Sequence, residues 1–304
     1  MLSLILLSTA LAGPTAALPS GGAAGAPATP AAASATVTAA REEAADVLGA
    51  SLDVAGKLDD EGSAAALLMA AAETAGESLG ESALAGDLQQ MLAEARARRA
   101  DEPGAVAAML EEGLRRTLGD LEFEPVMEAA LPEGFPPPTP VGEIEVKDYP
   151  LYRIARAGSG GNGAFWQLFQ HIQKHDIPMT APVEMTYDAT GDEVDMAFMY
   201  EFAAQGTPGP DGSVEVTDIP PMLVASIGCR GWSSETSKAE ALVKLRNWID
   251  ARDDLELAGP VRRFGYNGPS VRGDRRYYEI QIPVRRVKST EVAEASGEDL
   301  SGWR

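Results

Sequence analysis

The ten residues Asp176-Ile-Pro-Met-Thr-Ala-Pro-Val-Glu-Met185 decide the fold, because the chain carries them twice. A degraded copy, Asp254-Leu-Glu-Leu-Ala-Gly-Pro-Val-Arg-Arg263, follows 78 positions later and keeps the Pro-Val dipeptide. Each copy comes after a segment with helical spacing and before a segment that alternates like a strand. The repeat therefore marks a junction inside a duplicated structural unit.

The segments around the two junctions follow the same order. In the first unit we expect a strand at 151–157, a helix at 164–174 and strands at 183–188 and 194–202, with one more strand ahead of them at 143–147. In the second unit we expect a strand at 222–229, a helix at 236–250 and strands at 261–266 and 276–287. We predict an α+β fold in which two strand–helix–strand–strand units form a distorted β-barrel, antiparallel or mixed, with two flanking helices.

The first 40 residues carry no charged side chain. An apolar run at 2–12 is too short to span a bilayer, which takes about 20 helical residues, and it ends in small residues that suit signal-peptide cleavage. The Ala/Gly/Pro/Ser/Thr stretch that follows contains no acid and resembles a transit peptide. We predict a targeting leader at 1–40 that directs the protein to a plastid, and the alternative is a secreted or periplasmic protein.

Residues 41–131 are acidic and rich in alanine, with candidate helices at 41–58, 63–75, 82–99 and 103–118. Two interpretations fit: a small helical module, or a partly disordered acidic tether, since Ala-rich segments bury little area each. The Pro-rich residues 132–140 favour an extended, semi-rigid linker. The barrel domain is then expected at 141–288, followed by a polar tail at 289–304.

The composition narrows the classes of function. A net charge of -21 opposes binding to nucleic acid and to anionic membranes, so we expect no nucleic-acid partner and at most peripheral membrane association. The single cysteine, Cys229, excludes an intramolecular disulfide and a cysteine-rich metal site. No nucleophile stands beside a base in the sequence, so we expect no enzyme.

The two histidines, His171 and His175, lie four residues apart on one edge of the first predicted helix. They can share a metal, or one of them can reach a haem iron. The alternative is a pair of solvent-edge residues near a helix C-terminus. A metal site of two histidines alone lacks further ligands, so we predict no metal beyond a haem iron.

Residues 141–287 contain four ordered blocks: Val141-Gly-Glu-Ile-Glu-Val-Lys-Asp-Tyr-Pro150, Ala164-Phe-Trp-Gln-Leu-Phe-Gln-His-Ile172, Ile177-Pro-Met-Thr-Ala-Pro-Val183 and Phe264-Gly-Tyr-Asn-Gly-Pro269. Together they resemble the SOUL haem-binding family. The resemblance implies a duplicated barrel with two flanking helices that binds haem or a related tetrapyrrole and is not established as an enzyme. It supplies no axial ligand, because many members carry Tyr and Asn at the positions of His171 and His175.

We therefore predict a non-catalytic carrier, buffer or sensor that holds haem or a related planar tetrapyrrole in an apolar groove beside the first barrel helix. The expected apolar contacts are Phe165, Leu168, Ile172, Met179 and Met185, the expected axial ligand is His171 or His175, and the expected partners of the propionates are Arg262, Arg263, Arg272 and Arg275. One alternative is a scaffold subunit that docks on a plastid or membrane-associated complex through residues 41–131. Another is an enzyme acting on a small hydrophobic molecule.

Overall fold

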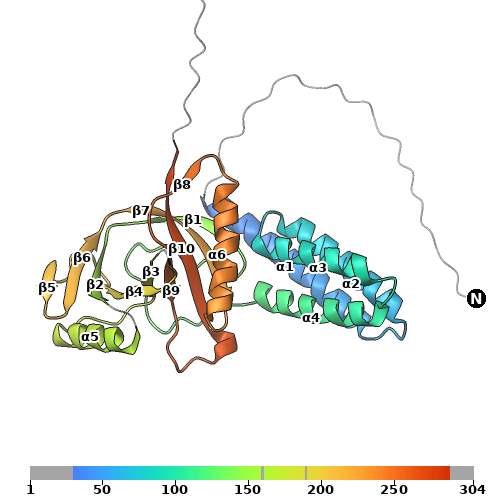
Figure 1. The fold of residues 1–304 in the computed structure, drawn as a ribbon, viewed down its shortest axis with the longest axis horizontal. Coiled ribbons are helices and arrows are strands. Elements are labelled where there is room, and N and C mark those ends of the chain that lie inside the picture. The colour runs from blue at the N-terminus through green and yellow to red at the C-terminus, as the bar shows by residue number, and fades with distance from the viewer. Residues whose placement is uncertain (1–29, 159–160, 189, 288–304) are drawn as a thin grey trace, which may run out of the picture.

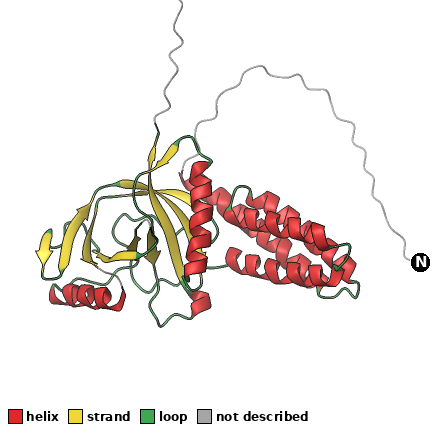
Figure 2. Ribbon diagram, in the orientation of Figure 1, coloured by secondary structure: helices red, strands yellow, loops and turns green. Residues whose placement is uncertain are grey.

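A computed structural model describes residues 30–158, 161–188 and 190–287. Most of the predicted leader and all of the predicted polar tail lie outside these residues. The described chain has two parts, a bundle of helices and a large sheet that carries two further helices (Figures 1 and 2). No helix in the described part is long and apolar enough to cross a membrane.

The N-terminal part is a four-helix bundle with a core of its own. Its helices are α1 Pro30–Ala55, α2 Glu61–Leu79, α3 Ala83–Arg98 and α4 Pro103–Leu121. Leucines and alanines fill the core, and the fully buried leucines are Leu48, Leu68, Leu88, Leu110 and Leu114. The sequence left two interpretations of residues 41–131, a small helical module or a partly disordered tether, and the structure shows a helical module.

Local signals explain where these helices begin. Asp60 and Ser82 cap α2 and α3, because each side chain accepts a hydrogen bond from a backbone N–H three residues later. Pro103 stands at the first turn of α4, where its missing N–H costs nothing. Pro30 has the same place in α1, so this helix begins inside the segment predicted as leader.

The second part is one antiparallel sheet with two helices. Its elements are β1 Ile144–Tyr149, β2 Tyr152–Gly158, α5 Gly161–Lys174, β3 Val183–Tyr187, β4 Glu193–Met199, β5 Gly209–Asp211, β6 Val214–Ile219, β7 Met222–Arg230, α6 Glu235–Asp250, β8 Leu255–Leu257, β9 Arg262–Gly265, the short 3₁₀ turn Gly273–Arg275 and β10 Tyr277–Arg286. The strand order is β1-β7-β10-β9-β3-β4-β2-β6-β5, with β8 paired to β10.

This order confirms the α+β class but not a closed barrel, so the expectation of closure was wrong. The two repeated units join where β3 pairs with β9, so the edge strand of each unit that faces the other unit is already hydrogen-bonded. The outer edges, β2 and β7, are extended by β6 and β1. Within the described residues nothing pairs β1 with β5, so the sheet stays open.

The repeat predicted from the junction is visible in the pairing. In the first unit β4 lies between β2 and β3, and in the second β10 lies between β7 and β9. The helix of each unit, α5 or α6, covers the same outer face of the sheet, and each packs into its own apolar core. The peptide bond Ala181–Pro182 of the first junction is cis.

The inner face of the sheet is covered by the chain segment that leaves the bundle. Phe123, Leu131 and Phe135 of this segment pack into the inner core. The Phe135 ring lies 5.0 Å from the Tyr149 ring and 5.0 Å from the Tyr152 ring. Residues 132–135 form a turn, with the Phe135 N–H bonded to the Pro132 carbonyl at 3.1 Å, and the segment packs into the core of the sheet domain.

Polar contacts join the bundle to the sheet domain. The buried guanidinium of Arg41 in α1 donates to Glu143 Oε1 and to the carbonyl of Val141, both at 2.8 Å. Its other nitrogen donates to the carbonyls of Asp120 and Leu121 at the end of α4. One side chain thus connects two helices of the bundle to the segment that enters β1.

Candidate functional site

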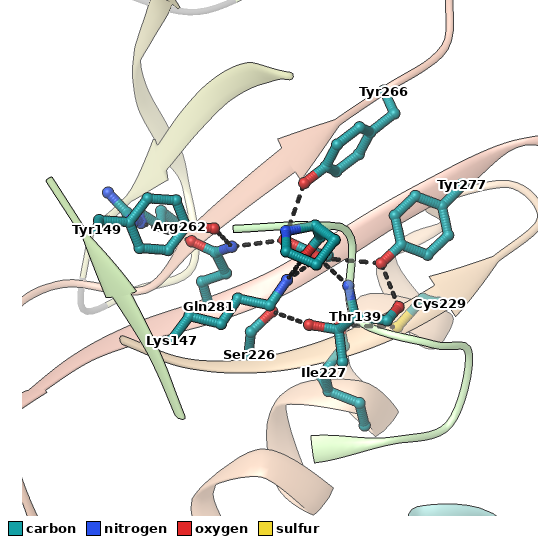
Figure 3. A network of polar contacts seen from close by, with 12 residues as sticks. Thr139, Lys147, Tyr149, Ser226, Ile227, Cys229, Arg262, Tyr266, Tyr277 and Gln281 are labelled. Carbon is teal, nitrogen blue, oxygen red and sulfur yellow. Dashed lines mark hydrogen bonds and ion pairs between the residues drawn. The ribbon is translucent and has the colours of Figure 1, made fainter. Parts of the chain in front are cut away.

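The inner face of the sheet holds a buried polar network that includes Lys147, Tyr266 and Tyr277 (Figure 3). Its centre is Glu279 of β10, which is fully buried. Its carboxylate accepts hydrogen bonds from Lys147 Nζ at 2.7 Å, Tyr277 Oη at 3.0 Å and Tyr266 Oη at 3.1 Å. Burial acts to raise the pKa of Glu279, but the charge and hydrogen bond of Lys147 outweigh it and hold that pKa below its usual value. The network is closed on itself, which fits a structural role.

Arg262 of β9, predicted to meet a propionate, belongs to this interior. It is only 4% exposed. Its Nε donates to Gln281 Oε1 at 3.0 Å and its Nη1 to Tyr152 Oη at 2.8 Å. Its guanidinium carbon also lies 4.5 Å from the centre of the Phe264 ring. This position suits an inner-face support of the sheet better than a contact with an external ligand.

The outer face is different, because its centre lies between the two helices. Here β3 and β9 pair, with Met185 opposite Arg263. Val183 and Met185 of β3 pack towards the core beneath α5, and Val261, just before β9, packs towards the core beneath α6. Arg263 Nη2 lies 2.8 Å from Met185 Sδ, and its buried Nε has no hydrogen-bond partner among the described residues.

The edge of α5 that faces β3 is aromatic. Phe165 and Phe169 stack at 6.2 Å, and Trp166 makes edge contacts with both rings. The Trp166 side chain is 58% exposed. Leu168 and Ile172, also predicted as ligand contacts, are buried beneath the helix in the core and present no surface.

A pocket of about 260 Å³ opens on the other side of the paired strands, against α6. Its apolar wall is made by Tyr187, Leu242, Val261 and Ile280, and its polar rim includes Glu235, Lys238 and Arg246. Lys238 Nζ lies 4.8 Å from the centre of the Tyr187 ring and 2.7 Å from Glu235 Oε1. The pocket thus combines apolar surface with two cations and with the carboxylates of Glu235 and Asp188.

His171, in the last turn of α5, and His175, which directly follows the helix, lie at its other edge, next to β5. His171 Nδ1 is 2.8 Å and His175 Nε2 is 2.7 Å from the same oxygen, Oδ2 of Asp211 in β5. His171 Nε2 is 2.7 Å from the hydroxyl of Tyr200. Burial lowers the pKa of His171, and hydrogen bonds from Lys174 and both histidines hold the pKa of Asp211 well below its usual range.

Asp211 was not identified from the sequence. It belongs to a strand of three residues, which is too short to show a periodic pattern. Two strands, β3 and β4, separate it from α5 in the sequence. Tyr200 comes directly after the buried run that ends β4 and was not singled out either. Only the fold brings these two side chains to the histidines.

The remaining predicted contacts are dispersed. Arg272 pairs with its neighbour Asp274 at 2.7 Å, and Arg275 lies 5.8 Å from the centre of the Phe123 ring, both in the connection between β9 and β10. Met179 is partly exposed in the junction before β3. Of the predicted set, the structure brings Phe165, Met185 and Arg263 to the outer face between the helices.

Comparison with known proteins identifies one family. Residues 138–283 match the model of the SOUL heme-binding protein family. Curated protein sequences contain no match to the chain.

Solved structures resemble the chain only distantly. The EcmrR C-terminal domain is 16% identical with a TM-score of 0.38, and the match covers 48% of this chain and 98% of that one. A structure described as a hydrolase from Listeria innocua is 9% identical with a TM-score of 0.37, over 48% of this chain and 93% of that one. Likeness at this level carries no functional argument.

Proposed function

Because residues 138–283 belong to the SOUL heme-binding protein family, we propose that this protein binds haem or a related tetrapyrrole without catalysing a reaction on it. The proposed site is the outer face of the sheet over β3 and β9, between α5 and α6. The carrier, buffer or sensor roles predicted from the sequence all rest on such a site.

The observation that carries the proposal is the combination of surfaces around the Met185–Arg263 pair. Met185 and Val261 supply apolar floor, and the aromatic edge of α5 borders it on one side. Ligand sites are mostly apolar with a few placed polar groups, and this face follows that rule. The thioether of Met185 also adapts to flat, polarizable ligands.

Cations at the rim of the pocket suit the carboxylates of a tetrapyrrole. Lys238 and Arg246 lie on the same edge of α6 as Leu242, one turn before it and one turn after it. Charge-assisted hydrogen bonds to a carboxylate are stronger than neutral ones. The unpaired Nε–H of Arg263 adds a donor at the floor. These groups fit the acidic side chains of haem.

The pocket at α6 is smaller than the roughly 300–1,000 Å³ of clefts that enclose a drug-sized ligand. A tetrapyrrole would therefore extend beyond it, across Met185 towards α5. Tyr187 is the residue of the pocket wall whose side chain type ligates haem iron in other proteins. His171 and His175 lie beyond the far edge of α5, so the proposal no longer assigns them to the iron.

Haemin titration of the full-length protein, followed at the Soret band, tests the proposal. We expect a saturable shift at micromolar haemin, and loss of at least about tenfold in affinity, roughly 1.4 kcal/mol, when Leu242→Glu puts a charge into the pocket. The matched control is Val243→Glu, the same change one residue on, at a position 57% exposed. It should bind like the unchanged protein.

The results of the titration distinguish haem binding at this site from binding elsewhere and from no binding. The absence of a saturable shift would overturn haem binding. A normal shift in Leu242→Glu together with a weakened shift in the His171→Ala/His175→Ala double variant would move the site to the opposite edge of α5. Repeating the titration with metal-free protoporphyrin IX and with Tyr187→Phe then shows whether binding depends on ligation of the iron.

The plastid location and a protein partner for the helical bundle stay predictions from the sequence. The most direct observation would be the compartment and binding partners of the tagged full-length protein. Loss of a partner on disrupting the exposed surface of α1 to α4 would support docking through the bundle.

A further inference from the structure

The histidine edge of α5 brings three possible metal ligands together. His171 Nδ1 and His175 Nε2 both point at Asp211 Oδ2, at 2.8 and 2.7 Å. The ligand atoms of the three residues all lie within 4.8 Å of one another, and no other such group occurs among the described residues. The cluster lies on the opposite edge of α5 from the aromatic side chains, so it is independent of the proposed tetrapyrrole site.

The way in which the ligands are held suits a metal ion. His171 lies in the last turn of α5, and His175 directly follows the helix with its N–H still bonded to the His171 carbonyl at 3.2 Å. This places the two imidazoles side by side, with ring centres 4.8 Å apart. The third ligand comes from a different element, β5. Lys174 Nζ binds the other carboxylate oxygen, Oδ1, at 2.7 Å and so fixes Oδ2 towards the histidines.

One ligand also has the outer support that metal-binding histidines usually have. A ligating histidine commonly holds its second ring nitrogen in a hydrogen bond that fixes the ring. His171 is 5% exposed, and its Nε2 is 2.7 Å from the buried hydroxyl of Tyr200. The Tyr200 ring is fitted closely, because a Cβ at Gly206 would lie 3.2 Å from its Cε2.

The Tyr200 hydroxyl can satisfy either proton arrangement of His171, because a phenol both donates and accepts. Without a metal, the Nδ1–H of His171 donates to Asp211 and the Tyr200 hydroxyl donates to Nε2. With a metal on Nδ1, the proton resides on Nε2 and is donated to the Tyr200 oxygen. The ring therefore keeps its position in both states.

We propose that His171, His175 and Asp211 form a binding site for a divalent transition metal ion of the zinc class. Two imidazole nitrogens and one carboxylate oxygen are ligands that Zn²⁺ accepts in tetrahedral sites, with the fourth position left to water. The ion replaces the hydrogen bonds that now converge on Asp211 Oδ2. It also ties β5 to the C-terminal end of α5, in addition to the apolar core that α5 shares with Val214 and Val216 of β6.

Titration of metal-free, full-length protein with Zn²⁺ by calorimetry, and with Co²⁺ by visible absorption, tests the proposal. We expect one equivalent of either ion, with intense Co²⁺ bands typical of a four-coordinate site. His175→Ala and Asp211→Asn should each reduce the affinity for Zn²⁺ by more than the roughly 10- to 100-fold that loss of an outer-shell partner costs. Tyr200→Phe, which removes the outer partner, should fall within that smaller range.

The controls keep the outcome interpretable. His175 is exposed and Asp211 is half-buried, so both variants are expected to fold, which circular dichroism checks. Asp192→Asn changes an exposed carboxylate elsewhere and should leave it unaltered. Absence of Zn²⁺ binding, or binding that His175→Ala and Asp211→Asn leave intact, would overturn the proposal, whatever the haemin titration shows.

Discussion

Met185 and Arg263 hold the same position in the two copies of the repeated junction, and they lie directly opposite each other where β3 pairs with β9. Their side chains touch, with Arg263 Nη2 2.8 Å from Met185 Sδ. A residue that faces its own counterpart marks an approximate two-fold axis, and here that axis relates the two halves of the sheet. Two identical charged residues at such a position would repel.

This relationship gives a reason for the divergence of the two copies. An arginine in both would place two guanidinium groups opposite each other on a partly buried face. A methionine in both would be tolerated as an apolar pair. With methionine in one copy and arginine in the other, the backbone keeps its approximate two-fold symmetry and no two like charges lie opposite each other.

Swapping the residues between the copies should therefore be asymmetric. We expect Met185→Arg to lower the free energy of unfolding by about 1 kcal/mol or more, because like charges then lie opposite each other. Arg263→Met should lower it by less, because it removes the hydrogen bond to Ser233 but creates no repulsion. Urea unfolding measures both, and Met185→Gln separates the effect of polarity from that of charge. Equal costs for the two swaps would contradict repulsion at the axis.

The Arg41–Glu143 pair should dominate the coupling between the bundle and the sheet domain. Both side chains are buried, and burial raises the pKa of Glu143 although Arg41 acts to lower it. Arg41→Met should destabilise the protein by about 3–5 kcal/mol, because it leaves a buried carboxylate unpaired.

Arg41→Met/Glu143→Gln removes that carboxylate and should recover a measurable part of the loss, as judged by thermal unfolding. If the double variant is no more stable than Arg41→Met, the lost hydrogen bonds to the backbone carbonyls account for the whole effect instead.

Glu279 should make stability depend on pH in acid. Its pKa is held below the usual glutamate value in the folded state, so the unfolded chain binds more protons as the pH falls. The stabilisation from Glu279 is therefore complete above the usual value and is lost as the pH falls through the lower folded value. Glu279→Gln should be less stable by about 3–5 kcal/mol at neutral pH, because Lys147 is left buried and unpaired.

The comparison that isolates this effect is unfolding by urea at a series of pH values from neutral to acid. Glu279→Gln should lose less stability across the acid range than the unchanged protein. Lys147→Met/Glu279→Gln should recover part of the neutral-pH loss. An identical pH profile for the unchanged protein and Glu279→Gln would show that other carboxylates control acid unfolding.

The sequence predicts well the elements that have a period. All four bundle helices and both sheet helices lie where apolar spacing places them, and the repeated junction predicts the two units and their order. The strands predicted from alternation also form, with bounds that shift by a few residues. These features are local or repeat in the sequence, and this makes them visible without the fold.

What the sequence does not predict depends on contacts between distant segments. The short strands β5 and β8 have no readable period, so Asp211 and its contact with the histidines could not be foreseen. The Pro-rich segment 132–140 suggests a spacer by composition, but Phe135 and Thr139 bury it across the sheet. Whether a sheet of this order closes depends on its two edge strands, and the repeat says nothing of them.

Gly142 should be essential to the contact between the bundle and the sheet. It has a positive φ of 76°, and a Cβ there would lie 2.3 Å from Leu84 Cγ in α3. Its carbonyl also accepts the N–H of Ala83 at 3.0 Å. Gly142→Ala combines left-handed strain of about 1–2 kcal/mol with that clash, so we expect a clear loss in the midpoint of thermal unfolding.

Gly86 in α3 is the matched control, because a Cβ there meets nothing within 4 Å. Gly86→Ala should stabilise the protein by about 0.5–1 kcal/mol through helix propensity. Similar effects of the two substitutions would show that the position of Gly142 tolerates a side chain and that the contact with α3 is loose.

Cys229 should be unreactive in the folded protein although it is the chain's single thiol. Burial raises the pKa of the Cys229 thiol to about 12, and the thiolate is the form that reacts. We expect iodoacetamide to label the native protein at pH 8 far more slowly than the same protein in guanidinium chloride, as followed by intact mass.

Gly228, the residue before Cys229, lies close to the segment that crosses the inner face of the sheet, since a Cβ there would lie 2.2 Å from the Thr139 carbonyl oxygen. Gly228→Ala should loosen that segment and speed labelling. Rapid labelling of the unchanged native protein would show instead that β7 opens readily at this point.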